Sequence, residues 1–372
     1  MMRTQQLRWT PDAGWSCPSS PLHDATLVMV FADSEHFQSA ACYEELKSLF
    51  PQAHIVGCSS SGNVEGTSIG DGDMVATAIC LEHGRVALAA GSVGEGEDTE
   101  ALAAGLMERL QAGDLRHVFV LSDGLMVNGS DLAKGINRAG IPVTGGLAGD
   151  GTRFGKTWVM ADAPAQPGRI VAVGFYGDVT IKSGCFAGWE EFGAERIVTR
   201  SVHNVVFEID GQPALQLYKK YLGDQARDLP GSGLRFPLSV REDKDGQAII
   251  RTLLAVDEAA QSLTFAGDVP QGYLCKLMKT NLDRIIDHAG MAAEAAKPGA
   301  RDIPGLCLVV SCVGRRLVLG QLTEEELEIV RENLGEATAI TGFYSYGELA
   351  PFGEVMQCQL HNQTMTLTTI YE

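Results

Sequence analysis

The sequence predicts an α/β protein, mixed α+β in detail, with layered mixed sheets and hairpins. In the first half, short apolar runs alternate with amphipathic helix-like segments, which is typical of α/β layers. The chain has 43 glycines, which indicates many tight turns rather than a helical bundle. Two β-rich runs, 73–82 and 85–93, meet at a turn containing Gly84 and predict a hairpin.

The first half is expected to supply strands and helices in turn. One helix should span 36–50 and stop at Pro51. A second should begin at Asp98 or Thr99, which can cap it, and reach about Gln111. A further helix and the glycine-rich segment 141–151 follow. The expected strands are the apolar runs 26–31, 53–58 and 116–124.

The second half begins with a stretch, 169–210, that contains little besides β-like runs. A helix should follow from Pro213 to Gly223, since proline favours the first helical position and glycine the end. Thr323 and Glu326 have the spacing of a capping box, which predicts a helix ending at Gly335. Further strands are expected at 248–256, 273–279 and 305–312, and a further helix at 281–296.

At 372 residues the chain is longer than one hydrophobic core usually serves. The segment 161–168 concentrates proline and alanine after the glycine-rich loop, which suggests a joint. We therefore expect two intimately joined halves, 22–168 and 169–372.

Composition restricts the function. The net charge of −18 argues against nucleic acid as a partner, because phosphate binding needs clustered lysine and arginine. Nine cysteines stand singly without a C-x-x-C pair, which fits free thiols in a reducing cytoplasm. The longest apolar runs, such as 26–31 and 305–313, are too short to cross a bilayer, so no membrane insertion is expected.

Several enzyme motifs fail on one position. The segment 149–157 resembles a phosphate-binding loop, but Asp150 replaces the required glycine and would face the phosphates. In 57–62 a serine, Ser61, occupies the second glycine of a nucleophile elbow, so Ser59 fits a ligand-binding or plain turn better than a nucleophile. The histidines stand alone, which argues against zinc but leaves open a non-covalent haem with one axial histidine.

Four polar or glycine-rich segments lie at the ends of strand-like runs, where open α/β sheets place ligands: 56–62, 121–124, 144–151 and 342–348. Gly57, Ser59, Gly145 and Gly146 belong to two of them and could let backbone N–H groups approach a ligand, although tight turns explain them equally well. Arg315 follows a buried strand and could clamp a carboxylate, with the adjacent arginine solvated or paired.

The last thirty residues concentrate polar side chains. Tyr344 and Tyr346 should share one face of a strand, with Glu348 following them if the strand continues. His361, Asn362 and Thr364 come just before the final strand. If the two strands pair, these groups form either one wall of a ligand pocket or a structural hydrogen-bond network.

Read with 57–62, 145–150, 210–223, 235–238 and 311–320, this tail resembles the FIST family, which has an N-terminal and a C-terminal FIST domain. The matching motifs span nearly the whole chain in order. The resemblance implies a non-enzymatic sensory protein for small ligands, with amino acids proposed. The tail residues and Gly57, Ser59, Gly145 and Gly146 match family motif positions.

The resemblance has a sharper form. A stand-alone subgroup resembles haem-binding nitric oxide sensors that regulate a partner histidine kinase and cyclic-di-GMP output. That form implies haem b held by His361 or His203, a two-component partner and a cytoplasmic location, and it is compatible with a homodimer. The alternatives are an amino-acid sensor without haem, an acyl hydrolase using Ser59 or Cys58, and an interaction scaffold.

Overall fold

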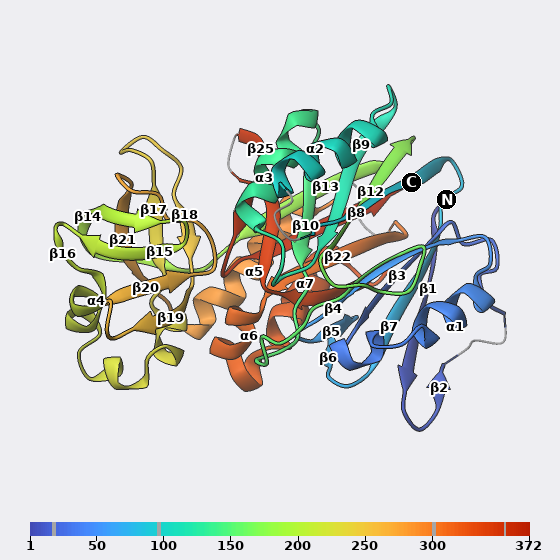
Figure 1. The fold of residues 1–372 in the computed structure, drawn as a ribbon. Coiled ribbons are helices and arrows are strands. Elements are labelled where there is room, and N and C mark those ends of the chain that lie inside the picture. The colour runs from blue at the N-terminus through green and yellow to red at the C-terminus, as the bar shows by residue number, and fades with distance from the viewer. Residues whose placement is uncertain (17–19, 95–97, 300–302, 353–354) are drawn as a thin grey trace.

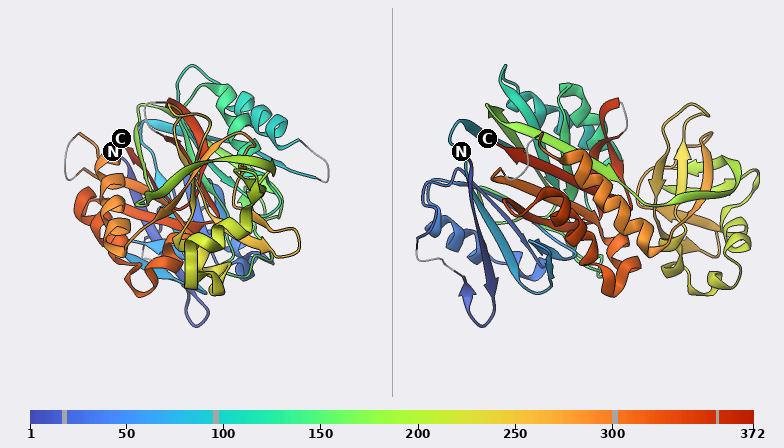
Figure 2. Two further views of the ribbon diagram at one scale, coloured as in Figure 1. Left: turned by 90° about the vertical axis from the view of Figure 1, so that its left-hand side faces the viewer. Right: turned by 180° about the vertical axis from the view of Figure 1, so that it is seen from behind.

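The chain folds into a larger body and a smaller lobe, seen side by side in Figure 1 and from two further directions in Figure 2. The computed structural model describes residues 1–16, 20–94, 98–299, 303–352 and 355–372. The body holds three six-stranded sheets, and the lobe holds one eight-stranded sheet with the order β18-β17-β21-β14-β15-β20-β19, in which β16 also pairs with β15. The predicted class, mixed α/β with layered sheets, is confirmed.

The first sheet has the strand order β11-β4-β3-β7-β1-β2. Its centre is fully buried, as the apolar sequence of β3 predicts. Helix α1 (Ala41–Leu49) packs on one face through Cys42 and Leu46. The strands are β1 (Arg3–Thr10), β2 (Gly14–Trp15), β3 (Leu27–Ala32), β4 (His54–Ser59), β7 (Met74–Cys80) and β11 (Val159–Ala161).

The second sheet has the order β25-β24-β10-β9-β12-β8 and combines early strands with two strands of the tail. Helices α2 (Thr99–Leu110) and α3 (Gly129–Ile136) pack against it, and Asp98 caps α2 as predicted. The strands are β8 (Gly84–Ser92), β9 (Leu115–Ser122), β10 (Val143–Leu147), β12 (Arg169–Gly177), β24 (Gly347–Phe352) and β25 (Val355–His361).

The third sheet has the order β13-β26-β22-β23-β5-β6. Helices α5 (Leu282–Ala296) and α7 (Glu325–Leu334) pack on it, and the short α6 (Val313–Leu319) follows β22 directly. The strands are β5 (Asn63–Glu65), β6 (Ser68–Gly70), β13 (Thr180–Phe186), β22 (Gly305–Cys312), β23 (Thr338–Ser345) and β26 (Met365–Tyr371). Strands β5 and β6, from the first part of the chain, thus form one edge of a sheet whose other strands come from later residues.

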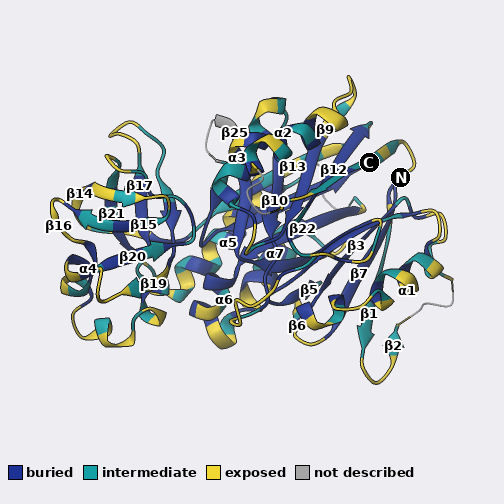
Figure 3. Cartoon of the chain, viewed as in Figure 1, coloured by how far each residue is buried: buried dark blue, intermediate teal, exposed yellow. Residues whose placement is uncertain are grey.

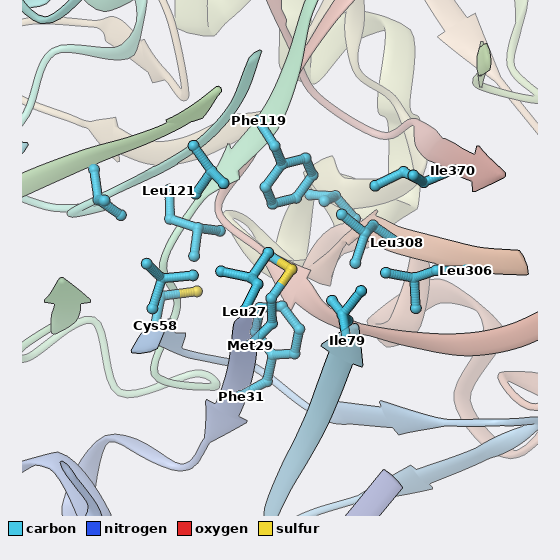
Figure 4. Close-up of a cluster of buried hydrophobic side chains, with 14 of the residues drawn as sticks. Leu27, Met29, Phe31, Cys58, Ile79, Phe119, Leu121, Leu306, Leu308 and Ile370 are labelled. Atoms are coloured by element: carbon cyan, nitrogen blue, oxygen red, sulfur yellow. The ribbon is translucent and has the colours of Figure 1, made fainter. Parts of the chain in front are cut away.

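All three body sheets meet in one apolar core. Figure 4 shows Leu27 and Phe31 of the first sheet, Phe119 of the second and Leu308 of the third within one buried cluster. The buried strands at the centre of the body are visible in Figure 3, with exposed residues on the outer helices. Because each sheet contributes to the same cluster, the two sequence halves cannot separate without opening it.

The smaller lobe is an insertion between β13 and α5, with its own core around helix α4 (Ala214–Leu222). The chain enters and leaves at one point, where Thr280 Oγ1 donates to the Gly188 carbonyl at 2.7 Å. The strands are β14 (Glu190–Val202), β15 (Val205–Ile209), β16 (Gln212–Pro213), β17 (Leu238–Arg241), β18 (Ile249–Arg251), β19 (Leu253–Asp257), β20 (Ser262–Phe265) and β21 (Leu274–Lys279).

Two local predictions are wrong. The expected hairpin at 73–93 does not form, because β7 pairs with β1 and β3 whereas β8 pairs with β12 in the second sheet. The side chain of Glu372 accepts the backbone N–H groups of Glu82 and His83 at 2.7 Å, which fixes the crossing between sheets. The capping box at Thr323 also does not form, since its hydroxyl donates to backbone carbonyls and Glu326 is buried elsewhere.

In the part of the chain that the structure describes, every helix is too short or too polar to cross a bilayer.

Candidate functional site

A cavity of about 440 Å³ lies where the body meets the lobe. Junctions between domains are a preferred place for small-molecule sites. The body contributes Gly124, Leu125, Val127 to Gly129, Leu147, Phe154, Cys312 to Gly314, Leu317, Tyr346, Leu360 and Asn362. The lobe contributes Asn204, Pro230, Gly231, Leu234, Thr252 to Leu254 and Phe265 to Asp268. Two of the predicted site residues, Tyr346 and Asn362, therefore line this cavity.

Two buried aspartates shape the body wall. Asp123 accepts the N–H groups of Leu125 and Met126 at 2.8 and 2.7 Å, which holds the loop after β9 in a tight turn. Asp150 accepts the N–H groups of Phe154, Gly155 and Lys156 at 2.8 to 2.9 Å. The loop that resembles a phosphate cradle is thus wrapped around its own carboxylate.

Tyr346 joins this loop to the cavity. Its hydroxyl donates to Asp150, and its ring stacks on Phe154 with centroids 4.8 Å apart. Burial acts to raise the pKa of the Asp150 carboxyl, but the hydrogen bonds from Tyr346 and the loop N–H groups lower it overall. The Asp150 carboxylate is therefore ionised, and the loop N–H groups and Tyr346 take up its acceptor positions. Burial raises the pKa of the Tyr346 hydroxyl, which stays protonated.

Tyr344 and Tyr346 do not share a pocket. The chain leaves the third sheet after Ser345 and enters the second at Gly347, so the strand is interrupted at Tyr346. Tyr344, fully buried, donates its hydroxyl to Glu326 at 2.7 Å on the other side of the crossing. The period-two rule applies only within one strand, which is why the predicted common face does not exist.

Glu348 and Thr364 belong to a buried network at this crossing. Glu348 accepts from the Ser345 hydroxyl at 2.6 Å, from the Thr364 hydroxyl at 2.8 Å and from the Thr364 N–H at 3.2 Å. Burial raises the pKa of Glu348 to about 7 despite these donors. Neither residue lines the cavity. For this part of the tail, the geometry therefore supports a structural hydrogen-bond network rather than a pocket wall.

Arg315 is buried with Glu326, and neither side chain is exposed. Its Nη2 lies 2.9 Å from Glu326 Oε2 and 2.8 Å from the Ile285 carbonyl, and its Nη1 donates to the Ala187 carbonyl. The adjacent Arg316 pairs with Asp71 at 2.6 Å. As predicted, one arginine points inward and the other is paired at the surface. The inward one, Arg315, connects α6 to α7 and α5, and it is not a lining residue of the cavity.

The glycine-rich positions of the two strand ends serve packing. A Cβ at Gly57 would collide with Val30, and one at Gly145 with the Val120 carbonyl. Gly146 is similarly confined by Val310. Ser59 is fully buried, and its Oγ accepts the N–H of Trp158 at 3.0 Å. None of these four predicted residues lines the cavity.

Neither candidate haem ligand is among the residues that line the cavity, although both are chain neighbours of lining residues. His361 is buried in the β24–β25 pair, where its Nε2 lies 3.0 Å from the Ala350 carbonyl, and burial lowers its pKa to about 4. His203 is exposed at the turn between β14 and β15. Among the described residues no group of three or more His, Cys, Asp or Glu could hold a metal ion.

Sequence reasoning missed the lobe side of the cavity. Thr252 is the key residue there: it is 4% exposed, and its Oγ1 has no hydrogen-bond partner among the described residues. Its N–H approaches Asn362 Oδ1 at 3.5 Å across the junction. The available signal was a polar pair, Arg251 and Thr252, interrupting the apolar run that was predicted as one strand at 248–256 and that forms two.

A body and a lobe that enclose a cavity with a few buried polar groups have the arrangement in which proteins commonly place small-molecule sites. Family models identify the chain further: the FIST N domain matches residues 26–212, and the FIST C domain matches residues 214–351. The chain therefore belongs to the FIST family, which implies a sensory role for small ligands in signal transduction. No match was found among curated proteins.

Two solved structures are similar over the whole chain. One is a chorismatase, with 9% identity and a TM-score of 0.36, covering 100% of this chain and 99% of that one. The other is cyanuric acid hydrolase from A. caulinodans, with 10% identity and a TM-score of 0.40, again covering 100% and 99%. Likeness at this level does not extend to activity.

Proposed function

We propose that this FIST chain senses a small organic molecule bound in the cavity between body and lobe, without catalysing a reaction. The observation that carries the proposal is the cavity itself, which has walls from both parts and a buried Thr252 hydroxyl that no described residue hydrogen-bonds. An unsatisfied buried hydroxyl costs about 1–3 kcal/mol, and a ligand that hydrogen-bonds to it removes that cost.

The junction around the cavity is suited to a change of lobe position. On one side, Ile250 and Met278 of the lobe pack on Ile285 and Leu319 of the body and form an apolar contact. Beside the cavity, single hydrogen bonds cross between the parts, such as Gln363 Nε2 to the Leu234 carbonyl at 3.2 Å. A ligand that touches both walls selects the lobe position that it fits best.

The bound state would then pass to a partner protein in the cytoplasm. The family resemblance points to a histidine kinase and cyclic-di-GMP signalling as that output. An amino acid is the ligand class that the resemblance suggests for a FIST protein without haem.

The test is a thermal-shift screen of the full chain against amino acids, amines, amides and carboxylic acids, repeated on a variant with a narrowed cavity. Gly231 lines the cavity, and a Cβ atom there would meet no atom within 4 Å, so Gly231→Phe should not clash with the backbone around it. Gly113→Phe is the matched control, because Gly113 is equally open but lies outside the cavity. We expect a hit that shifts wild type and the control but not Gly231→Phe. A screen without hits, or hits that Gly231→Phe retains, would contradict the proposal.

The haem-based form of the sensor has less support, because the residues present do not fit the group. His361 is engaged within a strand pair, and the described lining contains no histidine. Haemin titration of the purified protein tests this form. A Soret shift that is lost in His361→Ala or His203→Ala would favour haem, and an unchanged spectrum would remove it.

The hydrolase alternative also has less support. Ser59 Oγ accepts a backbone N–H, and burial raises the pKa of the Cys58 thiol well above its usual range, so a reactive thiolate is disfavoured. Turnover of an activated ester by wild type that disappears in Ser59→Ala would overturn the non-enzymatic assignment.

A further inference from the structure

Charge is unevenly distributed around the cavity. Among the described residues that line it, Asp268 is the only one with a carboxyl side chain, and lysine, arginine and histidine are absent from that lining. Burial raises the pKa of both the Cys312 thiol and the Tyr346 hydroxyl, so both stay neutral. The aspartate makes no ion pair within 4 Å among the residues that the structure describes. The described lining therefore holds one acidic side chain and no basic one.

The cations nearest to the cavity are engaged elsewhere. Arg153, in the loop that bears Phe154, pairs with Asp33 at 2.9 Å, and Lys156 lies over the Trp158 ring at 4.2 Å. Arg251 is buried behind Gly267, and its Nε and Nη1 donate to the carbonyls of Asp268, Ile250 and Leu360 at 2.9 to 3.1 Å. Arg251 and Lys134, whose charges act on Asp268, lie outside the lining. A ligand carboxylate in the cavity would therefore meet Asp268 and no basic side chain of the lining.

The neutral polar groups lie together on the wall between lobe and body. Thr252 and Asn362 are 4% and 0% exposed, and the N–H of the first approaches the Oδ1 of the second. Asn362 Nδ2 donates to the carbonyl of His361 at 3.0 Å, while Thr252 Oγ1 has no hydrogen-bond partner in the part of the chain that the structure describes. This pair offers hydrogen bonds to an uncharged or cationic head group.

The remaining walls are mostly apolar, and the mouth is apolar as well. Large hydrophobic side chains are seldom left exposed together unless they contact something. Leu125, Phe154, Leu254 and Leu317 all line the cavity and are 41 to 50% exposed. They come from both body and lobe, so one apolar molecule lying in the mouth would cover residues from both parts.

We propose that the cavity takes an amphipathic small molecule with an apolar body and a head group that is neutral or bears an ammonium, and that it discriminates against carboxylates and phosphates. This inference rests on the proposed function. A free amino acid presents a carboxylate to the same wall, and its amide or amine relatives fit better.

Three probes of nearly equal shape test the inference on the full chain by calorimetry at neutral pH: 3-phenylpropylamine, 3-phenylpropionamide and 3-phenylpropionate. The amine and the amide should bind at least about tenfold more tightly than the carboxylate. Asp268→Asn should reduce the affinity for the amine by about tenfold and leave the amide unchanged. Thr252→Val should weaken the amide, and the exposed Asp245→Asn serves as control.

The outcomes separate the ligand class from the site. If the carboxylate binds as tightly as the amine and Gly231→Phe abolishes this binding, the proposed ligand class is wrong but the cavity is still the binding site. Amine binding that Gly231→Phe does not change lies outside the cavity and overturns both. Failure of all three probes overturns the ligand class, and the broader thermal-shift screen then decides the proposed function.

Discussion

Glu348 is a carboxylic acid held among hydroxyl groups where the tail crosses between two sheets. Its pKa is raised from 4.5 to about 7, mainly because burial penalises the charged form. The protonated form is therefore favoured by folding. The resulting stability is fully present below the unfolded pKa of 4.5 and is lost as the pH rises through 7.

Glu348→Gln should remove this pH dependence. The amide oxygen can accept from Thr364, and the amide nitrogen can donate to Ser345 Oγ, whose proton then goes to the Ser311 carbonyl at 3.2 Å. Relative to wild type, the variant should gain about 2–3 kcal/mol in free energy of unfolding between pH 4.5 and pH 8. Urea denaturation across this range measures it, with the exposed Glu332→Gln as control. Parallel curves for the variant and wild type would show that Glu348 titrates normally.

Among larger elements, the loop 149–157 shows how one side chain organises a segment. Asp150 satisfies three consecutive N–H groups that would otherwise bind an anion, and it also accepts from Tyr346. The sequence identified Asp150 as the residue that spoils a phosphate loop. It did not reveal that the same carboxylate positions Phe154 at the mouth of the cavity.

Asp150→Ala should release this loop. Loss of the acceptor leaves the N–H groups of 154–156 without partners, at a cost of about 1–3 kcal/mol, while the Tyr346 hydroxyl keeps only the Gly151 carbonyl at 3.0 Å. Hydrogen–deuterium exchange at 154–156 should accelerate, while exchange in β9 and β12 stays as in wild type. Asp178→Ala, in an exposed turn, provides the control. Unchanged exchange at 154–156 would show that the loop holds its shape by other contacts.

Sequence patterns predicted elements well where the evidence was local. Strand β3, helix α2 with its Asp98 cap and helix α4 ending at Gly223 all form as expected. Patterns failed where a strand changes sheet, as at the β7–β8 turn and at Tyr346, because local periodicity says nothing about the strand's partner. The lobe wall of the cavity was missed for the same reason, since Thr252 meets Asn362 only through the tertiary fold.

At the scale of the whole molecule, Arg251 fastens the lobe to the body. It is 4% exposed, burial lowers its pKa to about 10, and its Nη1 donates to the Leu360 carbonyl of the body at 2.9 Å. Backbone carbonyls satisfy its Nε and Nη1. The charge thus holds together backbone segments from both sides of the junction.

Arg251→Met should loosen the lobe without unfolding the body. The carbonyls of Leu360, Ile250 and Asp268 lose their donor, which should cost about 1.5–3 kcal/mol at the junction. Hydrogen exchange should rise in β18 and at the body residues around Leu360, and remain unchanged in β3 and β22. The control is Arg241→Met, because Arg241 pairs with Glu195 inside the lobe. Equal changes in both variants would mean that Arg251 has no special role at the junction.

The single entry and exit point of the lobe has a consequence for how such proteins diversify. Gly188 and Thr280 are joined by a hydrogen bond, so the ends of the inserted segment already lie together. Segment 189–279 is thus a cassette that could be exchanged while the three-sheet body keeps its core. Such an exchange would replace about half of the cavity wall in one step, which gives the same body a new chemical preference.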